Sequence, residues 1–197
     1  KDCYPNYKSK LYFHCSWNEG GMGWPLDRLI KDFGLNNDDV LTTYNCKNCH
    51  KWEIRPYTGE DQDCKICGAS KSQVTPGVTS QIPDKELSKI YGIADASISA
   101  FTSGGLELTS VQSLLCGLPL LCSEYSCGED FVKNDFVFKL DGSFTYEVSS
   151  GFRKHCPNQD TMVNFYKTIC EMPEEKRLEI GQKGREWALK EFDVSVI

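Results

Sequence analysis

The feature that most constrains this chain is the grouping of four of its eleven cysteines into two tight pairs. Cys46 and Cys49 form one Cys-x-x-Cys pair, and Cys64 and Cys67 form another after fourteen intervening residues. Two such pairs at this separation are typical of a tetrahedral metal site in which each pair occupies one turn. Four thiolates leave no open coordination position, so the pattern predicts a structural zinc ion and not a catalytic one.

Two other uses of the paired cysteines stay open, namely two disulfides or a redox-active Cys-x-x-Cys. Gly68 suits the positive-φ position of a turn after the second pair. His50 adjoins Cys49, and we interpret it as a bystander and not as a replacement ligand. The other cysteines are scattered, several of them in apolar runs, which indicates reduced thiols and a cytoplasmic protein. They are Cys3, Cys15, Cys116, Cys122, Cys127, Cys156 and Cys170.

Composition excludes several broad classes. A chain of 197 residues with 40% hydrophobic and 25% charged residues is globular in composition. The 22 Lys and Arg against 28 Asp and Glu give a net charge of -6, which argues against general nucleic-acid binding. No stretch of about 18 apolar residues occurs, so no membrane span is expected.

Hydrophobic periodicity predicts strands that alternate with helices. We expect strands at 11–15, 39–43, 72–75, 78–79, 95–100, 120–122 and 136–140, and helices at 26–33, 83–93, 108–116, 160–172 and 173–192. This alternation is typical of an α/β fold with a Rossmann-like parallel sheet. The polar cysteine segment interrupts it. The predicted domains are therefore residues 1–44 with 72–197, and an inserted zinc ribbon at 45–71.

A glycine-rich loop follows one predicted strand and precedes a helix. Ligands of open α/β sheets bind beyond the carboxyl ends of strands, where glycines let the backbone approach an anion. A plain tight turn is the alternative. Gln112 lies five residues into the helix and is expected to face the same crevice. The candidate ligand-binding residues are Ser103, Gly104, Gly105, Leu106, Glu107 and Gln112.

Three segments resemble glycosyltransferase family 4. They are Glu86–Ala96, Thr102–Pro119 and Glu174–Phe192, which are similar to the family's helix before the strand, its donor-binding segment and its closing helix. Outside residues 45–71, the chain resembles the C-terminal, donor-binding half of a GT-B glycosyltransferase. Its Thr-Ser-Gly-Gly-x-Glu variant is closer to glycosyltransferases of large phages and giant viruses, which extends the expected location to the cytoplasm of a virus-infected host cell.

The resemblance implies specific roles. Backbone amides of Gly104, Gly105 and Leu106 would hold the diphosphate of a nucleotide sugar. Gln112 falls at the position of the glutamate that binds the ribose in the family, and it has an amide in place of the carboxylate.

This chain also departs from the family pattern. The family's first glutamate falls on Gly104, and Glu107 is the candidate substitute. The phosphate-binding Arg/Lys pair has no match, because Trp24 stands where the lysine would be. Candidate replacements are Lys71, Arg153 and Lys154. Losing charge-assisted bonds weakens a diphosphate site, so the donor could be unusual or activity lost.

The expected function is that of a nucleotide-sugar-binding domain of a glycosyltransferase whose acceptor-binding half lies elsewhere in the same or another chain. No catalytic residue is assigned. The alternative is an inactive binding or assembly module, in which the zinc ribbon contacts protein or nucleic acid. GxGxxG, GxxxxGK[ST] and GxSxG motifs are missing, which disfavours NAD, P-loop and hydrolase chemistry.

Overall fold

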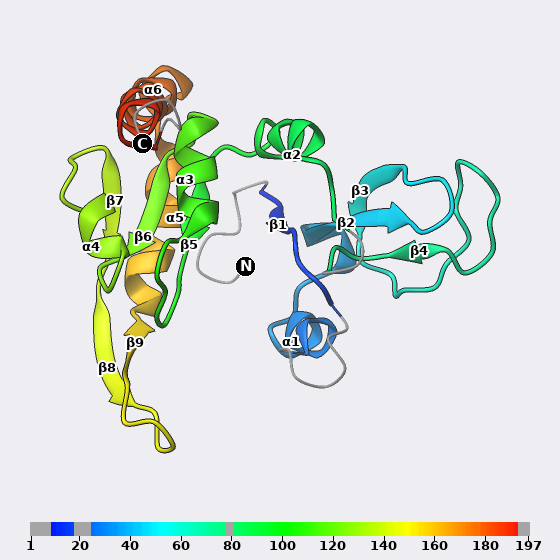
Figure 1. Ribbon diagram of the computed structural model, residues 1–197, viewed down its shortest axis with the longest axis horizontal. Coiled ribbons are helices and arrows are strands. Elements are labelled where there is room, and N and C mark those ends of the chain that lie inside the picture. The colour runs from blue at the N-terminus through cyan, green and yellow to red at the C-terminus, as the bar shows by residue number, and fades with distance from the viewer. Residues whose placement is uncertain (1–8, 18–24, 78–80, 193–197) are drawn as a thin grey trace. The chain divides into compact units, whose positions relative to one another are not determined.

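The computed structural model describes residues 9–17, 25–77 and 81–192. The chain divides into two compact units, Lys1–Asp84 (unit 1) and Lys85–Ile197 (unit 2). Both units, drawn in Figure 1, combine helices with parallel strands, so the predicted mixed α/β class is confirmed. The described strands of the two units belong to different sheets, which differs from the one sheet expected from the sequence, and a Rossmann-like fold stays a prediction. The strand expected at 78–79 and Trp24 lie outside the described residues.

Unit 1 is built on the central strand β2. Its elements are β1 (Leu11–Phe13), α1 (Leu26–Asp32), the 3-10 helix η1 (Asn37–Asp39), β2 (Val40–Cys46), β3 (Trp52–Pro56) and β4 (Gln73–Val74). β1 pairs in parallel with β2, with Leu11 opposite Val40. β3 and β4 pair with β2 in antiparallel fashion.

The cysteine segment shares this sheet, which differs from the expected domain division. β2 runs without interruption from Val40 through Cys46, across the boundary expected between residues 44 and 45. Cys46 lies opposite Gln73 of β4, while the start of the same strand pairs with β1. Backbone hydrogen bonds thus make the cysteine segment part of unit 1 and not a separate module.

A small aromatic cluster fills the core of unit 1. Trp17, Ile30 and Val40 are buried together. The ring of Tyr57 stacks on Trp17 with centroids 3.9 Å apart. The Trp17 indole Nε1–H donates to Thr42 Oγ1 at 2.9 Å, which satisfies the polar edge of the buried ring.

Unit 2 contains three parallel strands in the order β5-β6-β7, joined by helices. Its elements are α2 (Asp84–Tyr91, which begins at the unit boundary), β5 (Ser97–Ser99), α3 (Leu108–Leu115), β6 (Leu120–Ser123), α4 (Gly128–Phe131), β7 (Val137–Leu140), β8 (Gly142–Tyr146), β9 (Arg153–Pro157), α5 (Gln159–Glu171) and α6 (Glu174–Phe192). The elements that the sequence predicted agree with these ranges within two residues at each end, except that β2 continues to Cys46. β3, α4 and the pair β8–β9 were not predicted.

Unit 2 has a larger apolar core than unit 1. One cluster contains Val111, Leu114, Leu120, Cys122, Phe131, Val137 and Ala188, and a second contains Leu121, Leu140, Phe165 and Ile169. α6 approaches the end of α3 closely, because a side chain on Gly181 would collide with the carbonyl oxygen of Gly117. A Cβ on Gly184 would lie 2.8 Å from Leu114 Cδ2. The glycines of the closing helix are therefore packing residues.

The hairpin β8–β9 extends away from the parallel sheet of unit 2 (Figure 1). The two strands pair in antiparallel fashion, with Phe144 opposite His155. All five residues of β8 are exposed. The candidate cations Arg153 and Lys154 lie in β9, and the adjoining His155 is only 1% exposed.

Candidate metal centre and glycine-rich loop

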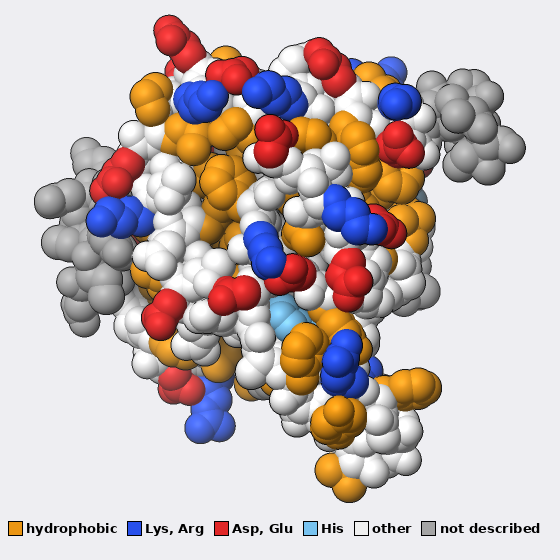
Figure 2. Space-filling model, turned by 90° about the vertical axis from the view of Figure 1, so that its left-hand side faces the viewer, with side chains coloured by type: hydrophobic (Ala, Val, Ile, Leu, Met, Phe, Trp, Pro, Cys, Tyr) orange, Lys and Arg blue, Asp and Glu red, His pale blue; other side chains and the backbone are white. Residues whose placement is uncertain are grey.

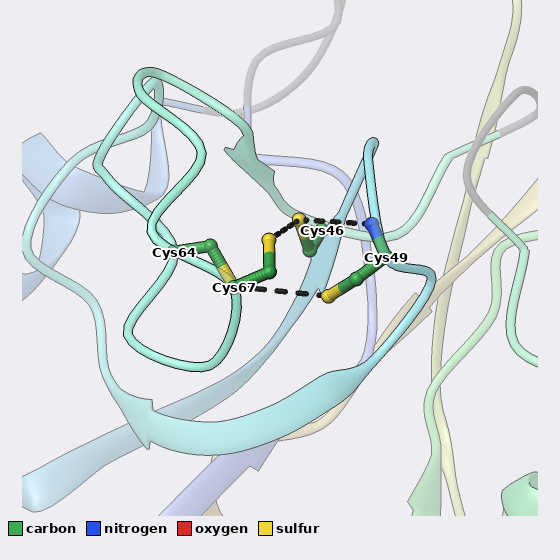
Figure 3. A group of neighbouring side chains, drawn as sticks. All are labelled: Cys46, Cys49, Cys64 and Cys67. Atoms are coloured by element: carbon green, nitrogen blue, oxygen red, sulfur yellow. Dashed lines mark hydrogen bonds between the residues drawn. The ribbon is translucent and has the colours of Figure 1, made fainter.

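The structure brings the four paired cysteines together (Figure 3). Their Sγ atoms all lie within 4.8 Å of one another. Two close contacts join the pairs: Cys46 Sγ lies 3.8 Å from Cys67 Sγ, and Cys49 Sγ lies 3.9 Å from Cys64 Sγ. All four are free thiols. The group is therefore capable of holding a metal ion.

The two Cys-x-x-Cys turns repeat the same backbone geometry. The N–H of each leading cysteine donates to the carbonyl five residues later, Cys46 to Lys51 at 3.0 Å and Cys64 to Ala69 at 2.9 Å. The N–H four residues after each leading cysteine donates back to that cysteine's carbonyl, at 3.0 Å from His50 and 2.9 Å from Gly68. Both sulfurs of a pair consequently face the other pair, as the sequence predicted.

Each turn places the residue after its second cysteine in the left-handed region. Gly68 has φ of 74°, which confirms the expectation from the sequence. His50 occupies the equivalent position in the first turn with φ of 55°. A β-carbon is unfavourable there, so His50 carries strain that Gly68 avoids. The His50 side chain is exposed and is not among the clustered ligands, in keeping with a bystander.

Hydrogen bonds to sulfur differ among the four thiols. Cys46 Sγ lies 3.3 Å from Ser72 Oγ and accepts from the N–H groups of Asn48 and Cys49 at 3.4 Å. The Ser72 contact and these N–H bonds lower the pKa of the Cys46 thiol to about 6. Although a bond from the Lys51 N–H opposes the change, burial and the neighbouring thiols raise the pKa of Cys49 to about 12.

A second set of bonds closes the loop that carries Cys64 and Cys67. Asp63 Oδ1 accepts from the Lys71 N–H and from the Ser70 hydroxyl, both at 2.9 Å, and the Lys71 bond is the main cause of its lowered pKa. The Lys47 N–H donates to the Ser72 carbonyl at 2.8 Å. These bonds tie both turns together through protein groups alone.

Arg55 joins the loop before Cys64 to the sheet. Its guanidinium lies 3.8 Å from the ring centroid of Tyr44, and it donates to Gln62 Oε1 and Glu53 Oε1 at 2.8 Å. The Tyr44 hydroxyl donates to the Gly59 carbonyl at 2.7 Å. No role for Arg55 was predicted from the sequence. Its placement over the fully buried Tyr44 gives it a structural role in unit 1.

The glycine-rich loop lies where the sequence predicted, between β5 and α3. Ser123 at the end of β6 holds its start, since Ser123 Oγ accepts from the Phe101 N–H and donates to the Phe101 carbonyl, both at 3.1 Å. Ser126 Oγ donates to the Gly104 carbonyl at 2.5 Å. The loops that follow the carboxyl ends of β5 and β6 are therefore bonded to each other.

One candidate cation reaches this loop. Lys154 Nζ of β9 donates to Ser103 Oγ at 3.0 Å. Arg153 instead lies over the rings of Phe144 and Tyr125, at 4.4 and 5.5 Å from their centroids. Lys71 belongs to unit 1, beside the cysteines.

The other residues predicted to bind a ligand at this loop differ in their exposure and in their hydrogen-bond partners. Gly105 and Leu106 are exposed, and Glu107 occupies the position before the first residue of α3. Glu107 Oε1 accepts from the Thr109 hydroxyl at 3.2 Å. Gln112 Oε1 accepts from the Tyr91 hydroxyl at 3.1 Å, so this amide is tied to α2.

A comparison with models of known protein families found no match, and a comparison with curated protein sequences found none either. Among the described residues, no helix has the length and apolar character needed to cross a membrane.

Proposed function

We propose that unit 2 is the nucleotide-sugar-binding part of a glycosyltransferase. The observation that carries the proposal is the convergence of three features on one loop: the Ser-Gly-Gly segment, the start of α3 and the Lys154 ammonium at 3.0 Å from Ser103. A helix start offers free N–H groups to an anion, and a neighbouring ammonium adds charge. A diphosphate is an anion of suitable chemistry.

Lys154 compensates for the family cations that this sequence lacks. It comes from β9, far along the chain from the first strand and its helix, where the family's cations lie. Of the candidates Lys71, Arg153 and Lys154, it alone makes a described hydrogen bond to the loop. Gly105 and Leu106 in the same loop are exposed, and a Cβ at Gly105 would meet nothing within 4 Å, which leaves room for a donor phosphate. Since Gln112 is bonded to Tyr91, we do not assign it to the ribose here.

A thermal-shift screen of the full chain with nucleotide sugars and nucleoside diphosphates tests this proposal. A ligand present at about a hundred times its Kd stabilises the state that binds it by about 2.7 kcal/mol. Lys154→Gln removes a charge-assisted bond and should weaken binding by about tenfold. Lys190→Gln, a matched loss of one exposed lysine in α6, should not. Absence of any shift with every nucleotide and nucleotide sugar contradicts the proposal.

The cysteine cluster has a role of its own in the proposed function, as a structural zinc site. Zn–S bonds of about 2.3 Å in a regular tetrahedron separate the sulfurs by about 3.8 Å. The Sγ distances of 3.8 and 3.9 Å between the pairs match this value. A disulfide requires about 2.05 Å, so the geometry favours a metal ion. With four sulfur ligands the zinc would have no position for water and would act by folding unit 1.

Elemental analysis of the purified chain, with one zinc expected per chain, tests the metal identity. Replacement with cobalt should give the absorption bands of tetrahedral thiolate coordination. Cys64→Ser should lose both signals, and Cys156→Ser, which changes an exposed cysteine of unit 2, should keep them. Stoichiometric iron in place of zinc, or no metal at all, would contradict the assignment.

A second candidate function is binding of nucleic acid or protein by the surface around the cysteines. The acidic side chains near this surface are engaged internally: Glu53 with Arg55, Glu60 with Thr75, Asp61 with Lys47, and Asp63 with Ser70. Among the described residues, the recorded ion pairs do not include Lys51, Lys65 or Lys71. Salt-dependent retention on DNA that Lys65→Gln and Lys71→Gln reduce would favour this function over a purely structural cluster.

A further inference from the structure

The hairpin β8–β9 ends in a loop that presents large apolar side chains to solvent. The loop is closed by backbone bonds, with the Glu147 N–H donating to the Phe152 carbonyl at 2.9 Å and the Gly151 N–H to the Glu147 carbonyl at 2.8 Å. Gly151 has φ of 70°, which completes the turn. The tip therefore has a defined conformation, and its side chains are displayed from a fixed frame.

The apolar exposure is concentrated toward this tip. The exposed fraction is 48% for Phe144, 67% for Tyr146, 103% for Val148 and 68% for Phe152. Figure 2 shows hydrophobic side chains gathered on the projecting end of unit 2, with cationic side chains beside them. Soluble proteins seldom expose several large apolar groups together unless a partner covers them.

The charge of the hairpin is opposite to that of the chain. Residues 142–157 contain two cations, Arg153 and Lys154, and one carboxylate, Glu147, whereas the whole chain has a net charge of -6. The Glu147 carboxylate accepts from the Ser150 hydroxyl at the tip. Among the described residues, the recorded ion pairs include neither Arg153 nor Lys154. The guanidinium of Arg153 lies 4.4 Å from the ring centroid of Phe144, so a free cation adjoins the apolar group.

We propose that the hairpin docks on an anionic phospholipid bilayer, with Tyr146, Val148 and Phe152 entering the interface and Arg153 facing the lipid phosphates. Aromatic rings with a polar atom favour the depth of the headgroups, and cations just behind them gain from the negative surface potential. The order along the hairpin, with apolar groups at the tip and the Arg153 guanidinium in β9 behind it, matches the order of acyl chains and headgroups in a bilayer.

The small size of the tip favours a bilayer over a second copy of the chain. A stable protein interface uses about 20–30 residues on each side, and the hairpin, residues 142–157, is shorter than that. Because every β8 residue is exposed, the hairpin buries little apolar area against unit 2. Insertion of the tip into a bilayer would bury that apolar area without any further folding.

Cosedimentation of the full chain, with its metal bound, measures this docking. One set of vesicles contains equal parts of phosphatidylcholine and phosphatidylserine, and the other contains phosphatidylcholine alone. We expect binding to the anionic vesicles that weakens in high salt. The double variant Val148→Asp with Phe152→Asp should lower the partition coefficient by about tenfold or more, because each change replaces buried apolar area with a charge.

Two further variants make the result specific. Leu178→Asp changes an exposed apolar residue of unit 2 that lies in α6 and not in the hairpin, at 61% exposure, and should leave binding unchanged. Val148→Trp should strengthen binding, since tryptophan favours the interface. Because Val148 and Phe152 are exposed, their variants should keep the urea midpoint of the wild type.

Three outcomes overturn the proposal. The first is no binding of the wild type to anionic vesicles. The second is equal loss of binding in Leu178→Asp and in the double variant. The third is a dimer in sedimentation velocity that the double variant breaks up while vesicles have no effect, which assigns the tip to a second copy of the chain.

Discussion

The two units use parallel strand pairing in common but stabilise it in different ways. Among the residues that the structure describes, unit 2 surrounds its strands with apolar clusters of seven and four buried residues, whereas the cluster of unit 1 has three. In unit 1 the central strand instead places buried polar groups at Thr42, Thr43 and Asn45 and ends at the first residue of the cysteine cluster. Parallel strand pairing in both units therefore does not mean that the same interactions stabilise them, because the described residues of unit 2 bury more apolar side chains than those of unit 1.

This contrast explains why the cysteines belong to unit 1. A sheet with little apolar area needs other favourable terms to offset the conformational entropy of folding. A metal ion bound by the four cysteines would supply such a term, and the hydrogen bonds of Arg55 and Asp63 hold the surrounding loops in place. Unit 2, with its larger core, has no comparable group of metal ligands among its described residues.

Removal of the metal is the strongest test of the contrast. Chelation, or Cys64→Ser, should unfold unit 1 while unit 2 keeps its protection, since metal binding in small thiolate sites is worth about 10 kcal/mol or more. Hydrogen exchange followed by mass spectrometry separates peptides of the two units. Cys156→Ser serves as the control for cysteine loss. Equal loss of protection in both units would show that they fold as one cooperative block.

The converse test destabilises unit 2 through its helix packing. Gly181→Ala places a Cβ against the Gly117 carbonyl and should cost about 3 kcal/mol. Gly105→Ala, whose Cβ meets nothing within 4 Å, is the control. Urea unfolding should show a lower midpoint for Gly181→Ala alone, with the metal affinity of unit 1 unchanged. A normal midpoint would mean that α6 does not approach α3 this closely.

A smaller effect compares the two cysteine turns within unit 1. Gly68→Ala should destabilise the metal-bound state by about 1 kcal/mol, because alanine is disfavoured at positive φ. His50→Gly should change stability in the opposite direction by a similar or smaller amount. Competition with a chromophoric zinc chelator reports both shifts. Shifts of the same sign would show that the turns are not equivalent.

The smallest expected effect is a pH dependence of unit 1. Burial lowers the pKa of His14, so the folded state favours the neutral ring. The stability that the neutral ring contributes is present above the unfolded-state pKa of about 6.5, and it is lost as the pH falls toward the lower pKa of the folded state. His14→Gln should therefore have a flatter stability profile than the wild type between neutral and mildly acidic pH. Since both proteins contain the same thiolates, the difference between their urea midpoints isolates His14.

Local patterns predicted much of the molecule. The spacing of Cys46, Cys49, Cys64 and Cys67 was sufficient to predict their cluster, because each pair is set by a short turn. The helices and buried strands also agreed, since their apolar periodicity is strong. The hairpin β8–β9 was missed because all residues of β8 are exposed, which removes the alternation that reveals a strand.

The candidate loop lies between β5 and α3, as the sequence predicted, whereas its contacts with other segments come from the tertiary structure. Gln112 was expected to face the crevice beside this loop, and its side chain accepts a hydrogen bond from the Tyr91 hydroxyl. Lys154 was one of several candidate cations, and the choice among them depended on the path of β9. Such contacts join residues far apart in the sequence, and no local pattern determines them.

The sequence by itself determined the cysteine pairs, the turn glycine Gly68 and the order of most helices and strands, because these depend on interactions among residues a few positions apart. Only the tertiary structure decided that β2 continues into the cysteine segment, that Arg55 stacks on Tyr44 and that Lys154 meets Ser103. Each of these depends on chain segments that come together through packing and strand pairing, whose free energy is shared over the whole unit.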